Sequence, residues 1–255
     1  PSEYCLRHFV VSSEADTLMS DGWGNPLYNL ERAARGYFVY KIVLMRQAIS
    51  IMYTGIIQAL CPVTTLEDKP GLKSFVIELP PQLTTGLQLG ASVSIDGVCF
   101  TVTTIDGQLV GFDAMQETLE TTTIGSLKQG DSVNIERSAK MGDEIGGHPM
   151  SGHVSAMAEI VLINESENNK SITFKVDPEW MRFIFSKGFV GLDGLSLTVV
   201  DAQKDSGEFK VFFIPESLKL TRFGSKQVSD FVNVEIDPQT QVIVETVERV
   251  MAERG

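Results

Sequence analysis

The chain has 255 residues, 43% hydrophobic and 21% charged, which is the balance of a globular protein with room for two domains. Its net charge of −12 at pH 7 argues against a nucleic-acid-binding protein, because such proteins usually carry a basic face. No apolar run has the length of a membrane-spanning helix. The three cysteines are irregularly spaced and form neither a disulfide framework nor a CxxC zinc motif. This cysteine pattern favours a reducing, cytoplasmic compartment.

Residues 1–51 match nothing further along the chain, and we interpret them as an extension outside the fold. They begin with Pro and hold five acidic and five basic residues, whereas a transit peptide is poor in acidic residues. Their most apolar part, residues 36–51, is short and is broken by Lys41 and Arg46. One interpretation is translated upstream sequence, with Met52 as the candidate natural start.

The remainder of the chain contains two similar halves. Residues 117–136 align without a gap with residues 216–235, and 9 of the 20 positions are identical. Upstream, VSIDGVCFTV (93–102) matches VGLDGLSLTV (190–199) at 5 of 10 positions. The period of about 98 residues is too long for a solenoid repeat and has the length of a domain. The sequence therefore predicts two copies of one domain, residues 52–148 and 149–236.

Both halves have the pattern of short β-strands. The segment FTVTTI (100–105) alternates between apolar and polar residues, and QLVGFDA follows it after the turn pair Asp106-Gly107. Two such segments around a tight turn predict a β-hairpin. The second half repeats this as LTVVDA, a looser turn, and EFKVFFI. Further strands are expected at 55–60, 74–79, 132–136, 154–164, 171–176 and 231–236. Many short strands separated by turns are typical of an all-β barrel or sandwich.

The segment GGHPMSGH (146–153) lies where the two halves meet. It holds His148 and His153, two of the three histidines in the chain, among three glycines that allow close backbone approach. A zinc site is a minor possibility, since no third ligand follows at a familiar spacing. The pattern is compatible both with a glycine-rich linker whose histidines form hydrogen bonds and with a functional site.

Each half also carries an Asp-Gly loop followed by a small polar residue. Cys99 and Thr101 in the first half, and Ser196 and Thr198 in the second, alternate along a strand and so share one face. Turn chemistry explains the Asp-Gly pairs, and without a neighbouring base neither Cys99 nor Ser196 is a good nucleophile. Hydrogen bonding to a polar, planar heterocycle would need no such base.

The C-terminal segment changes character after Asp237-Pro238. Asp at the N-cap and Pro at the first helical position predict a helix over the remaining residues, 237–255. An apolar stripe at helical spacing is formed by Ile243, Val247, Val250 and Met251. This face either packs on its own barrel or meets a partner subunit.

Several long motifs together are similar to one known family. They are MYTGII (52–57), DGVCFTVT (96–103), FDAMQET (112–118), GDSVNIERSAKMGDEIGGHPMSGH (130–153), SKGFVGLDGLSLTV (186–199), IPES (214–217) and VNVEIDPQTQ (232–241). From residue 52 to about 254, the chain resembles riboflavin synthases, the lumazine-dismutating family. The one departure at a motif is Tyr53, where the family usually has Phe; Tyr keeps an aromatic ring for stacking.

The resemblance implies a fold, an assembly and a reaction. The family fold is two six-stranded Greek-key β-barrels followed by a C-terminal helix, and these helices assemble a homotrimer. Each active site forms between the N-terminal barrel of one subunit and the C-terminal barrel of another. The implied reaction converts two molecules of 6,7-dimethyl-8-ribityllumazine to riboflavin and 5-amino-6-(D-ribitylamino)uracil, with no metal or organic cofactor.

The resemblance also assigns site residues by position. The implied N-barrel substrate-binding residues are Tyr53, Gly55, Ile56, Ile57, Cys99, Phe100, Thr101, Asp113, Ala114, Met115, Gln116, Glu117 and Thr118. Those implied in the C-barrel are His148, Gly152, His153, Val154, Lys187, Asp193, Ser196, Leu197, Thr198, Ile214, Pro215, Glu216, Ser217, Leu218 and Asp237. For proton handling and activation of the nucleophile, the candidates are His153, Ser196, Cys99 and Thr198.

Two further function classes stay open at this level. The lumazine proteins, antenna relatives of the family, bind one lumazine or flavin without catalysis, and one of their halves departs from the motif. Here both halves keep theirs, which favours the enzyme. A purely structural or interaction protein built on the same barrels has no supporting motif, although fold alone does not determine function.

Overall fold

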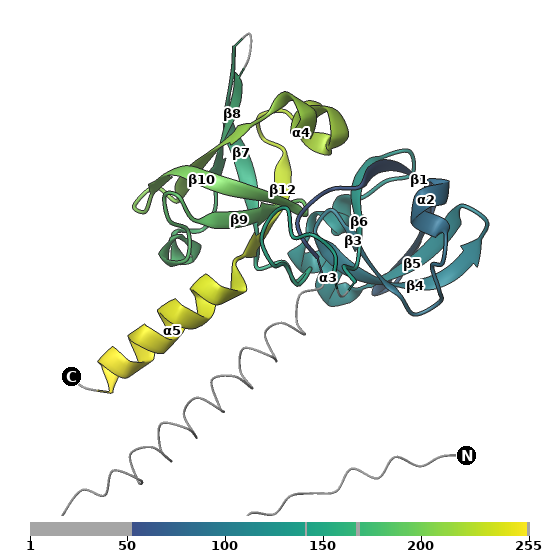
Figure 1. Ribbon diagram of the computed structural model, residues 1–255, viewed down its shortest axis with the longest axis horizontal. Helices are drawn as coiled ribbons and strands as arrows, with labels where there is room; N and C mark the ends of the chain where they lie inside the picture. Colours follow the sequence, from purple (N-terminus) through teal and green to yellow (C-terminus); the bar gives the residue numbers. More distant parts are fainter. Residues whose placement is uncertain (1–52, 141, 167–168, 254–255) are drawn as a thin grey trace, which may run out of the picture. The chain divides into compact units, whose positions relative to one another are not determined.

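The computed structural model describes residues 53–140, 142–166 and 169–253, so the predicted extension at 1–51 lies outside the described residues. The predicted fold class is confirmed: the described residues form two closed, six-stranded antiparallel barrels and a C-terminal helix (Figure 1). Around the first barrel the strands follow the order β1-β2-β5-β4-β3-β6, and the second barrel repeats it as β7-β8-β11-β10-β9-β12. The identical order shows that the sequence repeat is a repeat of topology.

The two barrels have these elements. The first contains β1 (Ala59–Lys69), β2 (Leu72–Glu78), α2 (Pro81–Thr84), β3 (Ser92–Ile95), β4 (Val98–Asp106), β5 (Leu109–Met115), α3 (Gln116–Thr121), η1 (Thr123–Ser126) and β6 (Ser132–Arg137). The second contains β7 (Ala156–Ser166), β8 (Asn169–Lys175), η2 (Pro178–Arg182), β9 (Phe189–Leu192), β10 (Leu195–Gln203), β11 (Glu208–Phe213), α4 (Pro215–Leu220), η3 (Arg222–Gly224) and β12 (Phe231–Ile236). The helix α5 (Pro238–Ala252) follows.

The predicted hairpin joins β4 to β5, but its turn lies one residue later than expected. Asp106 pairs with Leu109, so the two turn residues are Gly107 and Gln108. Gly107 has a φ of 60°, which a two-residue hairpin turn favours. Alternation along β4 places Phe100 in the core and leaves Cys99 and Thr101 on the outer face. Side chains for a site outside the barrel are thus separated from those that stabilise it.

The strand expected at 55–60 begins only at Ala59. Before it, the chain makes a single antiparallel bridge between Tyr53 and Met150. The amides of Thr54 and Gly55 donate hydrogen bonds to the Glu136 carboxylate, and Gly55 has a φ of 74°. This stretch of backbone therefore cannot continue a strand ladder. The short strands β3 and β9 were not predicted, because each has only four residues next to an Asp-Gly turn.

Each barrel has its own core, but the segments that lead into the two barrels are exchanged. Phe75, Phe100 and Phe112 pack together in the first barrel with ring centroids 5.3–6.3 Å apart. Ile57, which precedes the first barrel, belongs to the core of the second. Val154, which precedes the second barrel, packs against the core of the first. Each barrel therefore depends on the other for part of its packing.

The two Asp-Gly turns meet where the barrels touch. Asn134 Nδ2 donates to the Asp193 carbonyl at 2.9 Å, and Asn233 Nδ2 donates to the Asp96 carbonyl at 2.8 Å. A methyl group on Gly97 would lie 2.6 Å from the Gly194 amide nitrogen. Each half supplies the same contacts to the other, so the interface has approximate two-fold symmetry.

Gly97→Ala is expected to destabilise the protein more than Gly90→Ala. The two glycines have almost the same φ, 82° and 81°, and so should share a backbone cost of about 1 kcal/mol. Space around Gly90 is open, whereas Gly97 faces the Gly194 backbone, where overlap should cost a further ~1–3 kcal/mol. Urea unfolding of both variants measures the difference. Equal losses would show that close approach of the two turns contributes nothing to stability.

The predicted helix cap is confirmed at the start of α5. The Asp237 carboxylate accepts hydrogen bonds from the Gln239 and Thr240 amides, and Pro238 occupies the first turn. Val244 packs partly on the core of the second barrel. The apolar stripe is more than one-third exposed at every position in the single chain, namely at Ile243, Val247, Val250 and Met251. No helix among the described residues has the length and hydropathy needed to cross a membrane.

Candidate active site

Cys99 of β4 has an aromatic hydroxyl as its neighbour. The Tyr53 hydroxyl donates to Cys99 Sγ at 3.1 Å. Tyr53 is only 1% exposed, and burial, followed by this hydrogen bond, raises the pKa of its hydroxyl well above the ordinary tyrosine value. The Tyr53 hydroxyl therefore stays protonated and acts as a hydrogen-bond donor to the sulfur. Tyr53 thus provides a polar contact that the Phe usual in the resembling family could not make.

Ser196 of β10 has a neighbouring base that the sequence did not reveal. His148 Nδ1 lies 2.6 Å from Ser196 Oγ, and its ring stacks on Phe189 with centroids 5.2 Å apart. Burial lowers the pKa of His148 below the ordinary histidine value, against an opposing effect of Asp237, so the ring is neutral near pH 7. With its proton on Nε2, the ring can accept the serine hydroxyl proton at Nδ1, as a general base does.

The exchanged segments run across these two outer-face residues. The Gly55 carbonyl accepts from the Ser196 amide at 2.8 Å, and the Gly152 carbonyl accepts from the Cys99 amide at 2.9 Å. A methyl group on Gly55 would lie 2.5 Å from Ser196 Cβ, and one on Gly152 would lie 2.7 Å from Cys99 Cβ. Only glycine allows this approach, so predicted N-barrel and C-barrel residues are in direct contact within one chain.

Two buried glutamates at these segments were not predicted from the sequence. Glu136 accepts from the amide and hydroxyl of Thr54 and from the Gly55 amide. Glu235 makes the same three bonds with Ser151 and Gly152. Position was the signal that could have revealed them, because these two residues end the aligned segments 117–136 and 216–235.

The remaining predicted residues fall into three groups. Those with exposed side chains are Ile56, Thr101, Asp113, Met115, Gln116, Glu117, His153, Lys187, Thr198, Ile214, Pro215 and Glu216. Those that are half-buried are Thr118, Val154, Ser217, Leu218 and Asp237. Those that are buried, and can present at most backbone to a ligand, are Ile57, Phe100, Ala114, Asp193 and Leu197. The exposed group includes α3 and its equivalent α4, which immediately follow β5 and β11.

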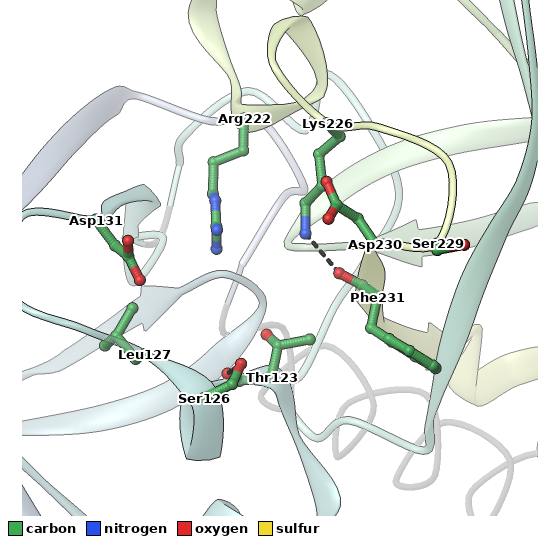
Figure 2. A pocket seen from close by; sticks show the side chains of 9 residues that line it. All are labelled: Thr123, Ser126, Leu127, Asp131, Arg222, Lys226, Ser229, Asp230 and Phe231. Carbon is green, nitrogen blue, oxygen red and sulfur yellow. Dashed lines mark hydrogen bonds between the residues drawn. The ribbon is translucent and has the colours of Figure 1, made fainter.

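A separate pocket of about 250 Å³ lies at the barrel interface and contains none of the predicted residues. Figure 2 shows its lining, with Arg222 and Lys226 from the second half and Thr123 and Asp131 from the first. Arg222 forms an ion pair with Asp96, and Lys226 Nζ lies 3.2 Å from Asp193 Oδ2. Burial, and then Asp193, raise the pKa of Asp96 to about 6, an effect that Arg222 opposes. The basic side chains here neutralise buried carboxylates of the two Asp-Gly turns.

The described part of the chain offers no ready metal site. Across residues 53–140, 142–166 and 169–253, no group of three or more His, Cys, Asp or Glu side chains is arranged to hold a metal ion. His153 and His148 differ in environment, since the first side chain is exposed and the second buried.

Comparison with known proteins determines the family. The model of the lumazine binding domain family matches twice, at residues 54–138 and 151–237. The riboflavin synthase of Escherichia coli strain K12 is 50% identical over 204 residues, which is 80% of this chain and 95% of that protein. The chain belongs to the riboflavin synthase family. The riboflavin synthase of Chlamydia pneumoniae is 43% identical over 204 residues, 80% of this chain and 99% of its own.

Solved structures agree with the riboflavin synthase family fold. The crystal structure of LumP complexed with 6,7-dimethyl-8-(1'-D-ribityl) lumazine has a TM-score of 0.65 and covers 72% of this chain and 98% of LumP. LumP complexed with riboflavin gives a TM-score of 0.66. At 22% and 24% identity, these likenesses concern the fold alone.

Proposed function

We propose that this chain is a riboflavin synthase. In the reaction, one molecule of 6,7-dimethyl-8-ribityllumazine transfers a four-carbon unit to a second, giving riboflavin and 5-amino-6-(D-ribitylamino)uracil. The main support is the 50% identity to the Escherichia coli enzyme across nearly all of that protein. Both halves also retain their outer-face polar residues, Cys99 with Thr101 and Ser196 with Thr198.

The duplicated fold suits a reaction between two identical substrates. Two equivalent half-sites can present two lumazine rings to each other, and orientation of this kind contributes a large share of many enzymatic rates. The remaining steps are removal of a proton from a ring methyl group, addition to the other ring and return of a proton. We assign these steps to His153, Ser196, Cys99 and Thr198, with His148 as the base next to Ser196. No added cofactor is required in this proposal.

The proposed substrate-binding surfaces follow the exposed predicted residues. In the first barrel they run from Ile56 past Thr101 to α3. In the second they run from His153 past Thr198 to α4, with Lys187 nearby. Exposure of these side chains in a single chain supports the proposal, because a ligand or a second subunit could reach them.

The proposed assembly is a homotrimer through α5. Its support is the exposed apolar stripe, which a single chain leaves uncovered. The proposed domain limits are 52–148 and 149–236 for the barrels and 237–255 for the helix. The proposed compartment is the cytoplasm, supported by the free thiols of Cys61 and Cys99.

The decisive experiment is incubation of the purified chain with 6,7-dimethyl-8-ribityllumazine and no added cofactor, followed by riboflavin absorbance. We expect riboflavin at half the molar amount of lumazine consumed. Tight lumazine binding without product would instead support an antenna-type binder. If the full chain binds without turnover but a chain beginning at Met52 produces riboflavin, residues 1–51 inhibit the enzyme; equal activity would dismiss that hypothesis.

A further inference from the structure

Glu136 and Glu235 are equivalent carboxylates at the ends of β6 and β12. Both side chains are buried, at 2% and 3% exposure. Glu136 Oε1 lies 2.7 Å from the Thr54 amide and 2.8 Å from its hydroxyl, while Oε2 lies 3.1 Å from the Gly55 amide. For Glu235 the corresponding distances to Ser151 and Gly152 are 2.6, 2.8 and 3.0 Å. Each carboxylate thus accepts from two backbone amides and one hydroxyl, and the two halves of the chain repeat the same arrangement.

The segment that each carboxylate holds acts on the other barrel. Glu136 is part of the first barrel, and the Gly55 carbonyl that it fixes accepts from the Ser196 amide in the second. Glu235 is part of the second barrel, and the Gly152 carbonyl that it fixes accepts from the Cys99 amide in the first. Each glutamate is therefore linked, through one hydrogen-bonded dipeptide, to the outer-face residue of the opposite barrel.

Ionisation of these groups matters for the contact. Burial raises the pKa of Glu136 and raises that of Glu235 to about 7, and in both cases the hydrogen bonds to the held segment oppose the shift. The charge of Glu136 adds to the rise in the pKa of Glu235, and the charge of Glu235 in turn adds to the rise in the pKa of Tyr53. A protonated carboxyl group has one oxygen that donates instead of accepting. Its capacity to accept the three bonds is lower, so the ionised form holds the dipeptide more firmly.

We propose that Glu136 and Glu235 are positioning residues that act across the barrel boundary, Glu136 on Ser196 and Glu235 on Cys99. The proposal rests on the proposed function for its catalytic meaning, but the positioning itself is a property of the fold. Neither carboxylate is hydrogen-bonded to Cys99 or Ser196; each acts through the dipeptide that it holds. Their effect is to fix how closely the Gly55 and Gly152 backbones approach the two outer-face residues.

Thiol alkylation tests this crosswise action without requiring turnover. The rate at which iodoacetamide modifies each cysteine of the full chain is followed by peptide mass spectrometry, which separates Cys99 from Cys5 and Cys61. Glu235→Gln places an amide donor against a backbone amide and should free the Gly152 segment that covers Cys99. We expect Cys99 to react about fivefold faster, the factor that corresponds to losing one net hydrogen bond.

The second arm uses Ser196→Cys as a probe at the equivalent position. In that background, Glu136→Gln should accelerate alkylation of the introduced thiol by about the same factor, while Cys99 is unchanged. Glu159→Gln, the same chemical change in the half-buried middle of β7, is the matched control and should alter neither thiol. In assays of riboflavin formation, both Glu136→Gln and Glu235→Gln should lower kcat/KM at least about tenfold, because positioning contributes strongly to rate.

Three outcomes would overturn the proposal. Equal acceleration of both thiols by either variant would indicate general loosening. Faster alkylation of the thiol in the same barrel as the substituted glutamate would show that each glutamate acts within its own barrel. Unchanged alkylation of both thiols would show that neither glutamate positions them. If no variant and no parent protein forms riboflavin, the proposed function fails, yet the alkylation pattern still decides whether the carboxylates act crosswise.

Discussion

Replacing His148 with phenylalanine is expected to lower kcat for riboflavin formation about 100-fold, since general base catalysis commonly contributes at least this factor. Phenylalanine keeps a planar ring against Phe189, so the buried site should remain filled. The substitution removes one hydrogen bond, the one between His148 Nδ1 and Ser196 Oγ at 2.6 Å. His148 Nε2 has no hydrogen-bond partner among the described residues, so nothing else is lost there. Substrate affinity, measured by fluorescence titration, should change little.

A double-mutant cycle with Ser196→Ala separates catalysis through the pair from two independent effects. If His148 acts through the serine hydroxyl, the double variant should be no slower than Ser196→Ala alone. Additive losses would contradict the assignment of His148 as the base for Ser196. Loss of folding in His148→Phe, detected by circular dichroism, would call for His148→Gln as the second variant.

The same contact predicts a pH dependence. Burial lowers the pKa of His148, so the imidazole is neutral in the folded protein through neutral pH. Protonation at low pH removes Nδ1 as an acceptor, and kcat should fall on the acid side, below the ordinary histidine pKa of about 6.5. Because the unfolded state binds this proton more readily, stability contributed by neutral His148 is also lost as pH falls below that value. Both effects should be absent in His148→Phe.

Ile243→Asp is expected to abolish assembly and, with it, most of the activity. Ile243 is 63% exposed in the single chain, within the apolar stripe of α5. A carboxylate at the centre of an apolar interface is costly to bury, so the variant should sediment as a monomer. If each active site needs barrels from two subunits, riboflavin formation should fall more than about 100-fold through loss of orientation. Sedimentation velocity and the absorbance assay measure the two effects.

Gln241→Asp is the control for the added charge. Gln241 lies near the N-terminus of α5 and outside the apolar stripe; the helix dipole there favours a carboxylate and offsets the loss of its hydrogen bond to Glu245. This variant should keep both assembly and activity. A monomeric but fully active Ile243→Asp protein would show that the catalytic unit is a single chain, and a trimeric variant would show that α5 is not the contact.

Part of the fold could be predicted because it depends on local pattern. Alternation around Gly107 reveals the β4–β5 hairpin, and Asp237-Pro238 reveals the start of α5. The repeat then extends each local prediction to a second copy. The start of β1 could not be predicted, since the residues before it are apolar enough for a strand, and what keeps them out of one is their bonding to Glu136 together with the positive φ of Gly55.

The site was predicted less completely, for a physical reason. Cys99, Ser196 and the two histidines are recognisable as chemical groups, but their partners are distant in sequence. His148 and Ser196 are 48 residues apart, and Thr54 and Glu136 are 82 apart. The periodic spacing of apolar residues in a sequence does not indicate which distant residues come into contact. The exchange of Ile57 and Val154 was hidden for a related reason: similarity between two halves does not tell which half uses a given residue.

The symmetry of the barrel interface has a consequence for the origin of this fold. In an isologous dimer every contact occurs twice with the two copies interchanged. The Gly97–Gly194 approach, the reciprocal Asn134 and Asn233 bonds and the exchanged leading segments all satisfy this condition. A single barrel of this kind could pair with a second copy of itself through the same surface.

Joining two such barrels in one chain frees them to diverge. In a true homodimer, Cys99 and Ser196 would have to be the same residue, and so would Tyr53 and Met150. Fusion allows one half to place a phenol beside a thiol and the other an imidazole beside a hydroxyl. The covalent link thus allows two equivalent positions, one beside Tyr53 and one beside His148, to differ in chemistry while the contacts between the barrels stay symmetric.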